Sequence, residues 1–257
     1  MTTPRLEAAI VAEQWLSDKR PEDAFPINCI QIADSLGIKV RGAKLPNDFQ
    51  GALFVNTAFT AIIYNENIKE EGRKNFTIAH EIGHFFLHSN RDEVKCSIED
   101  MGEFSISPHG KEIEKEANEF AAHLLMPESD MVPLIEDKPI DIHLLLYLAK
   151  RYGTTATATA CQLVNIVKSP LAVVLINSDN STNWCFRNRH FRDLFIKKGT
   201  VLKIPTHSPH HQVSSEQDIW FPTPIKTIWN IKSSSLEMEE YNQRLYILYG
   251  EQPASHI

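Results

Sequence analysis

The stretch FTIAHEIGHFFLH, residues 76–88, carries three histidines, two of them four residues apart beside a glutamate, on a segment that is otherwise almost entirely apolar. His80 and His84 are four residues apart, so on an α-helix they lie on the same face, where two imidazoles can reach one metal ion. Glu81 lies beside His80 and can take a proton from a metal-bound water. Burying these polar side chains without partners would cost several kcal/mol. The stretch therefore predicts a buried metal-binding helix.

A third ligand has to come from elsewhere in the chain, because a catalytic zinc usually keeps three protein ligands and one open position. Metzincins would place a histidine at residue 90, but Asn90 stands there and Leu87 replaces their glycine, so that class is excluded. Two histidines and a carboxylate favour Zn²⁺ over Mn²⁺ without excluding Mn²⁺.

The predicted helix at residues 111–126 offers four glutamates beside an apolar face. Glu114 lies three and seven residues before alanines of that face and is the first choice for the third ligand. Glu116 lies at the edge of the face and is the second choice. Glu112 and Glu119 are expected to face water. The apolar face comprises Ile113, Ala117, Phe120, Ala121, Leu124 and Leu125.

Several other histidines invite a functional interpretation. His88 returns to about the face of His80, so it supports the metal site from behind, contacts substrate or has a purely structural role. His109 and His123 are candidates for stabilising an oxyanion, although surface placement is favoured for both. An exposed loop is likewise favoured over a second metal site for the three histidines His207, His210 and His211.

Composition argues for a globular protein of ordinary type. The chain has 257 residues, of which 42% are apolar and 23% charged, and its net charge is −7. That charge disfavours general nucleic-acid binding, which requires a basic surface. Residues 92–141 hold 14 acidic and 4 basic residues, a local net charge of −10.

The cysteines, the first residues and the apolar runs bear on the compartment expected for the protein. The four cysteines are far apart and form no CxxC pair, which fits a reducing compartment. The first residues lack the apolar core of a secretory signal, and no apolar run approaches the length of a membrane helix. A cytoplasmic protein without a membrane contact is expected.

Hydrophobic periodicity predicts an α+β protein. Helices are expected at residues 6–16, 27–36, 70–88 and 111–126, followed by two or three helices between 141 and 167 with a break at 152–155. Strands are expected at residues 38–44, 51–56, 58–64, 171–176, 184–186, 201–204, 220–221, 228–231 and 245–249. Loops are expected at residues 90–110, 206–211 and 233–235.

Two motifs together carry a family resemblance. FTIAHEIGH, followed by Leu87 and His88, and EKEANEFAAHLLMP at residues 114–127 resemble the ImmA/IrrE family of metallopeptidases. The resemblance implies a zincin-like core with a small sheet and an active-site helix. It implies a gluzincin-like zinc site with His80 and His84 as ligands, Glu81 as general base and a glutamate of the second helix as third ligand. It also implies a cytoplasmic regulator that cleaves a helix-turn-helix repressor, releasing stress-response or mobile-element genes.

Three domains follow from this reading: a metallopeptidase domain at residues 1–137, a helix-turn-helix-like segment at 138–168, and a mixed α/β domain at 169–257 with a sensory or partner-binding role. The middle segment resembles the helical region that follows the peptidase core in this family. Its second helix offers mainly threonine and alanine, so packing or repressor docking is favoured over direct DNA contact.

Two alternatives stay open. The chain could be a non-enzymatic regulator, or a toxin–antitoxin-like partner, that binds a repressor or DNA. An exposed edge of the strands at residues 51–56 and 58–64 could hold an extended peptide by β-augmentation, or both strands could simply belong to the core.

Overall fold

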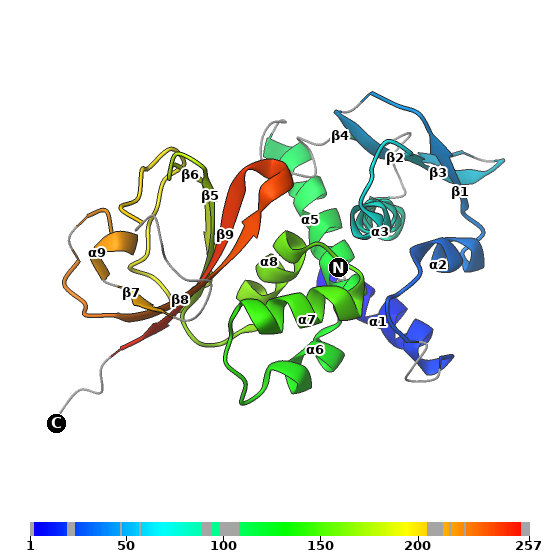
Figure 1. Cartoon of the computed structure of the whole chain (residues 1–257). Helices are drawn as coiled ribbons and strands as arrows, with labels where there is room; N and C mark the ends of the chain where they lie inside the picture. Colours follow the sequence, from blue (N-terminus) through cyan, green and yellow to red (C-terminus); the bar gives the residue numbers. More distant parts are fainter. Residues whose placement is uncertain are drawn as a thin grey trace. The chain divides into compact units, whose positions relative to one another are not determined.

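The computed structural model is a mixed α+β protein, which confirms that part of the predicted fold class (Figure 1). The chain divides into two compact units, Met1–Met131 with Ala149–Thr155 and Val132–Leu148 with Ala156–Ile257. None of the helices in the described part of the chain combines the length and apolar character that a membrane span requires. The structure describes residues 3–19, 24–46, 48–56, 58–88, 94–97, 108–204, 213–215, 217–223 and 225–252.

The first unit contains a sheet with the strand order β1-β3-β2-β4. Strand β1 runs parallel to β3, and the other neighbours are antiparallel. Because β2 and β3 each have a strand on both sides, the expectation of an exposed edge on them is wrong, and the alternative, in which both belong to the core, holds. The strands are β1 Lys39–Ala43, β2 Phe49–Val55, β3 Thr60–Asn65 and β4 Val94–Ser97.

Strand β4 also corrects the predicted loop at residues 90–110, because it pairs with β2 and α5 begins at Pro108. The rest of that stretch lies outside the described residues. Helix α3 packs on β2 and β3, and α5 packs against both α1 and α3. The helices of this part of the chain are α1 Pro4–Ser17, α2 Cys29–Ser35, α3 Glu71–His88 and α5 Pro108–Leu125.

The helices after α5 are α6 Glu128–Ile135, α7 Ile142–Tyr152 and α8 Ala156–Ile166. Gly153 has a φ of +61°, which lets the chain turn between α7 and α8 as the break in the periodicity predicted. Helix α6 was not predicted, since Pro127 marks the end of α5. The carbonyl of Pro127 also accepts a hydrogen bond from the amide of Met131 at 2.9 Å, so this proline begins the next helix.

A polar cluster in the first unit joins the start of α6 to the end of α7. The Arg151 guanidinium donates two hydrogen bonds to the Asp130 carboxylate, at 2.8 and 2.6 Å, and the Tyr152 hydroxyl donates a third at 2.7 Å. The ring of Phe25 lies 4.7 Å from the guanidinium carbon of Arg151. Burial and the bond to Asp130 raise the pKa of Tyr152, so this hydroxyl remains a donor.

Replacing Asp130 with alanine should destabilise the first unit by about 2–3 kcal/mol, because two donors that are partly or fully buried lose their charged acceptor. Chemical denaturation followed by fluorescence measures the change. Glu136→Ala, at the exposed position directly after α6, is the matched control and should change stability by less than about 0.5 kcal/mol. Equal stabilities of the two variants would contradict the assignment.

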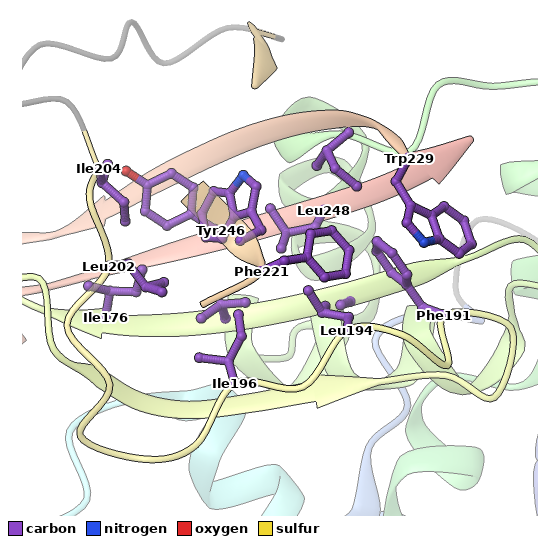
Figure 2. Packing of buried hydrophobic residues seen from close by; sticks show 14 residues of the cluster. Ile176, Phe191, Leu194, Ile196, Leu202, Ile204, Phe221, Trp229, Tyr246 and Leu248 are labelled. Carbon is purple, nitrogen blue, oxygen red and sulfur yellow. The ribbon is translucent and has the colours of Figure 1, made fainter. Parts of the chain in front are cut away.

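The second unit is built around an antiparallel sheet with the strand order β6-β5-β9-β8-β7. Its core is rich in aromatic residues: Phe191, Phe221, Trp229 and Tyr246 pack with aliphatic side chains (Figure 2), and Trp220 belongs to the same buried cluster. The elements are β5 Leu171–Asn177, β6 Thr182–Arg187, β7 Val213–Ser215, α9 Gln217–Trp220, β8 Asn230–Met238 and β9 Gln243–Glu251.

Three local predictions in this unit are wrong. Residues 233–235 are not a loop but the buried middle of β8, where the Ser234 hydroxyl accepts from the Ile142 amide at 3.0 Å. Residues 201–204 do not form the predicted strand: among them only Val201 forms an isolated β-bridge, with Ser181. Their apolar pattern reflects the burial of Leu202 and Ile204 in the core. Trp220 ends the short helix α9 instead of forming a strand. In each case contacts with other elements decide the backbone state.

Candidate metal centre

The site is formed where α3 and α5 pack closely together. A Cβ atom added at Gly83 would lie 3.1 Å from the Cβ of Phe120, so a larger residue there would push the two helices apart. The rings of Phe86 and Phe120 stack with centroids 5.7 Å apart. The predicted apolar face of α5 is buried along its whole length. Together these contacts hold the start of α5 beside the HExxH turn of α3.

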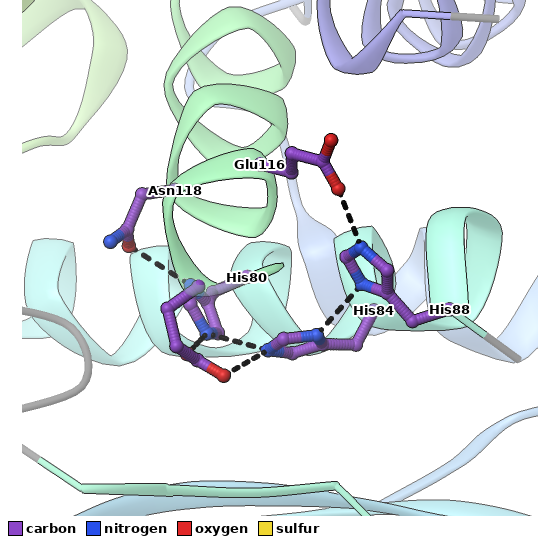
Figure 3. Close-up of polar contacts among 6 residues, drawn as sticks. His80, His84, His88, Glu116 and Asn118 are labelled. Carbon is purple, nitrogen blue, oxygen red and sulfur yellow. Dashed lines mark hydrogen bonds and ion pairs between the residues drawn. The ribbon is translucent and has the colours of Figure 1, made fainter. Parts of the chain in front are cut away.

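Three side chains converge at this contact. The Nε2 atoms of His80 and His84 are 2.9 Å apart. The Glu114 carboxylate approaches both, with Oε2 3.1 Å from His80 Nε2 and Oε1 3.4 Å from His84 Nε2. All three residues are buried. Figure 3 shows the imidazoles of His80 and His84 turned toward each other.

The geometry fits a divalent metal ion. One ligand atom from each of the three residues lies within 4.8 Å of the others, and no other such group of three is found in the described part of the chain. In a tetrahedral zinc site with bonds of about 2.0–2.1 Å, neighbouring ligand atoms are ~3.3 Å apart. The observed separations of 2.9–3.4 Å are close to this value. The two histidines and the carboxylate therefore form a metal-binding group.

Electrostatics in the group also favour a cation. Burial favours neutral His80, but its hydrogen bond to Glu114 and the charges of Glu81 and Glu114 outweigh burial and raise the pKa of His80. Burial lowers the pKa of His84 to about 4. Burial opposes the charge on Glu114, yet hydrogen bonds to both imidazoles bring its pKa down to about 2. An ionised carboxylate thus faces two ring nitrogens, and a metal ion would compete with a proton for them.

Glu81 lies next to this group on a different side of α3. Its side chain is fully buried, and a Cβ atom at Gly51 of β2 would lie 3.0 Å from its Oε1 and 2.7 Å from Cγ2 of Thr77. Strand β2 therefore passes close beside the Glu81 carboxylate, and glycine makes this approach sterically tolerable. Residue 51 is a constraint on the site that the sequence motif does not reveal.

The structure separates the four glutamates of α5. Glu114 joins the two imidazoles, whereas Glu116 accepts a hydrogen bond from His88 Nε2 through Oε2 at 2.9 Å and does not join the group of three. Because a carboxylate accepts, His88 is the donor in this pair. Glu112 and Glu119 are exposed, as predicted.

Two further residues touch the ligands from behind. His88 Nδ1 lies 3.0 Å from His84 Nδ1, and Asn118 Oδ1 lies 2.9 Å from His80 Nδ1 (Figure 3). Sequence reasoning named a position behind the ligands as one of the possible roles of His88, and missed Asn118. Its position four residues after Glu114, on the same face of α5, is the signal that could have identified it.

The other histidine predictions have mixed outcomes. His123 is buried, so the prediction of surface placement is wrong. It lies nine residues after Glu114 on α5, about 13 Å along the helix axis, too far to contact an oxyanion at the metal. The side chain of His109 and the residues of the predicted histidine loop, His207, His210 and His211, lie outside the described residues.

The buried side chain of His123 should make the stability of the folded protein sensitive to acid. Burial and the nearby charge of Arg5 lower its pKa from 6.5 to about 4. Between these two pH values the unfolded chain binds a proton that the folded chain does not bind, so the free energy of unfolding falls as the pH drops from 6.5 to 4, by on the order of 3 kcal/mol. In metal-free protein His123→Leu should reduce this pH dependence, measured by denaturation at several pH values. Replacement of the exposed His190 by glutamine should preserve it, and an unchanged slope in His123→Leu would contradict the prediction.

Comparison with known proteins extends these observations. A model of the peptidase M78 family, described as the IrrE N-terminal-like domain, matches residues 33–163. Among solved structures, a Mycobacterium tuberculosis transcriptional regulator resembles the chain with a TM-score of 0.51 and 13% identity, covering 96% of this chain and 76% of the regulator. At that identity the likeness concerns the fold alone. A search of curated protein sequences finds no match.

Proposed function

Since this chain belongs to the peptidase M78 family of IrrE N-terminal-like domains, we propose that it is a zinc-dependent endopeptidase that cleaves a helix-turn-helix transcriptional repressor. The observation that carries the proposal is the buried group of His80, His84 and Glu114 on two packed helices, with Glu81 beside it. This cleavage would take place in the cytoplasm and would derepress stress-response or mobile-element genes.

The proposed roles follow from the positions of the side chains. His80, His84 and Glu114 would hold the ion, for which Zn²⁺ is favoured by the ligand types, although Mn²⁺ remains compatible. A divalent ion bound there supplies a Lewis acid that polarises a peptide carbonyl and eases deprotonation of water. Glu81 takes the proton from the attacking water and passes it to the leaving amine. A structural metal site would not require Glu81, because it does not belong to the group of three.

The domain roles are part of the same proposal. Residues 1–137 form a zincin-like peptidase domain in which α3 lies against the sheet and carries the motif. Residues 138–168 form a helix-turn-helix-like segment that serves packing or repressor docking. Burial of Thr159 and Gln162 on α8 supports this role, because a helix that reads bases must present such side chains to the groove. Residues 169–257 form an α/β domain that senses a signal or binds a partner.

A protein substrate fits the charge distribution. The segment of residues 92–141 has a net charge of −10, and Glu112 and Glu119 within it are exposed. Helix-turn-helix repressors present basic surfaces to phosphates, so complementary charge would accelerate their encounter with this segment. The same negative charge disfavours direct DNA binding by this chain.

Incubation of the zinc-loaded protein with candidate helix-turn-helix repressors from the same organism tests the proposal. Mass spectrometry of the intact repressor should show two complementary fragments whose masses sum to the repressor plus one water. Their formation should require zinc and should stop with a chelator. If Glu81→Gln binds the repressor or DNA as the wild type does and neither protein cuts the repressor, a non-enzymatic regulator or toxin–antitoxin-like partner replaces the endopeptidase.

A further inference from the structure

We propose that His88 and Glu116 are positioning residues that hold His84 in the one tautomer able to bind the metal through Nε2. The inference rests on the proposed metal centre and assigns a role to two residues outside the group of three ligands. Three side chains from two helices form a continuous line in the structure, from the partly exposed carboxylate of Glu116 through His88 to His84 (Figure 3).

The direction of the two His84 ring nitrogens is the first step of the argument. Its Nε2 faces Nε2 of His80 at 2.9 Å and Oε1 of Glu114 at 3.4 Å, so this nitrogen is the one available to a metal ion. Its Nδ1 points away from the group and lies 3.0 Å from Nδ1 of His88. A metal-binding Nε2 must carry a lone pair, and a neutral imidazole then carries its hydrogen on Nδ1.

The far end of the line determines where the hydrogens are. A carboxylate oxygen accepts, so the Nε2 atom of His88, 2.9 Å from Glu116, carries a hydrogen and donates it. Nδ1 of His88 then accepts the hydrogen that a metal-binding His84 carries on its own Nδ1. This arrangement of hydrogens satisfies both contacts, and it leaves the lone pair of His84 Nε2 directed at the metal position.

The His80 side of the site has a shorter version of this arrangement. Its Nδ1 lies 2.9 Å from Oδ1 of Asn118, which can accept the same hydrogen directly. Helix α5 thus serves both histidines while it also provides Glu114. Glu116 projects from α5 in a different direction from Glu114, two residues earlier. Its carboxylate is therefore connected to His84 through the ring of His88, which lies in the last turn of α3.

Glu116 is the better position for a test because its side chain is 41% exposed, so truncation leaves no buried cavity. Loss of a hydrogen-bond partner behind a metal ligand typically lowers metal affinity 10–100-fold. Glu116→Ala should therefore weaken zinc binding by about this factor. Glu116→Gln keeps an acceptor oxygen without the charge and should restore affinity to within about threefold of the wild type.

The experiment measures zinc affinity of the full chain by competition with a chromophoric chelator, together with thermal unfolding of the metal-free protein. Glu119→Ala, an exposed glutamate one turn away on α5, is the matched control and should bind zinc as the wild type does. Nitrogen chemical shifts of histidine-labelled, zinc-loaded protein report the tautomer directly. They should show a protonated Nδ1 on His84 in the wild type and in Glu116→Gln.

Several results would overturn the inference. Wild-type zinc affinity in Glu116→Ala would do so, as would a loss of metal-free stability that accounts for the whole effect. A protonated Nε2 on His84 in the zinc-loaded wild type would also do so. His88→Phe, which keeps a ring and removes both nitrogens, should lower affinity at least as much as Glu116→Ala. If the wild type binds no zinc at all, the proposed function itself fails, and this outcome is distinguishable from the others.

Discussion

Glu81→Gln should abolish cleavage of the repressor while leaving the zinc content of the protein unchanged. Glutamine has nearly the same shape as glutamate but cannot take a proton from water at neutral pH, so the proton-transfer contribution, about 10²–10⁴-fold, is lost. The shape matters here because β2 passes so close to this carboxylate that Gly51 has no room for a side chain. Single-turnover cleavage followed by mass spectrometry measures the rate, and atomic absorption measures the metal.

A matched control is available on the same helix. Glu71 lies in the first turn of α3 and is exposed, so Glu71→Gln removes the same charge without touching the site and should cleave at the wild-type rate. Normal cleavage by Glu81→Gln would rule out the role of Glu81 as general base. Loss of zinc from this variant would mean that Glu81 helps to hold the ion.

Glu114→Ala should lower zinc affinity by about 10³-fold or more, a larger loss than the 10–100-fold expected for residues behind the ligands. The variant removes a ligand atom that lies 3.1 Å from His80 and 3.4 Å from His84. Zinc stabilises the folded wild type by an amount that grows with the ratio of free metal to Kd. Added zinc should therefore raise the Tm of the wild type and leave that of Glu114→Ala unchanged.

The order of the effects discriminates between the two candidate ligands. Glu119→Ala should respond to zinc as the wild type does, and Glu116→Ala should show an intermediate loss. If Glu116→Ala loses more affinity than Glu114→Ala, Glu116 is the third ligand and the assignment from the structure is wrong.

Much of the metal-binding group could be predicted because its spacing is local. The positions of His80 and His84 relative to each other depend only on the 3.6-residue period of one helix, which the apolar residues around them establish. The same period placed Glu114 toward the interior of α5 and Glu112 and Glu119 toward water, and the structure has them so. Two helices separated by a turn at residues 152–155 were also visible in the periodicity.

Features that depend on distant parts of the chain could not be predicted in the same way. Residues 233–235 are three serines that resemble a loop, yet hydrogen bonding to neighbouring strands and to the Ile142 amide makes them the middle of a buried strand. Strand β4 lies in a polar segment and is recognised only through its pairing with β2. His123 is buried because α5 is covered by α1, where local polarity suggested the surface.

By itself, the sequence determined the helix that carries the metal ligands, the α+β class and the residue types that a divalent ion requires, because a helix fixes the relation between residues three or four apart. Only the tertiary structure decided which glutamate joins the two imidazoles and which one pairs with His88, and that Asn118 lies behind His80. Those contacts link residues 28–38 positions apart. They depend on how closely α3 approaches α5 at Gly83 and Phe120, a distance that no local periodicity encodes.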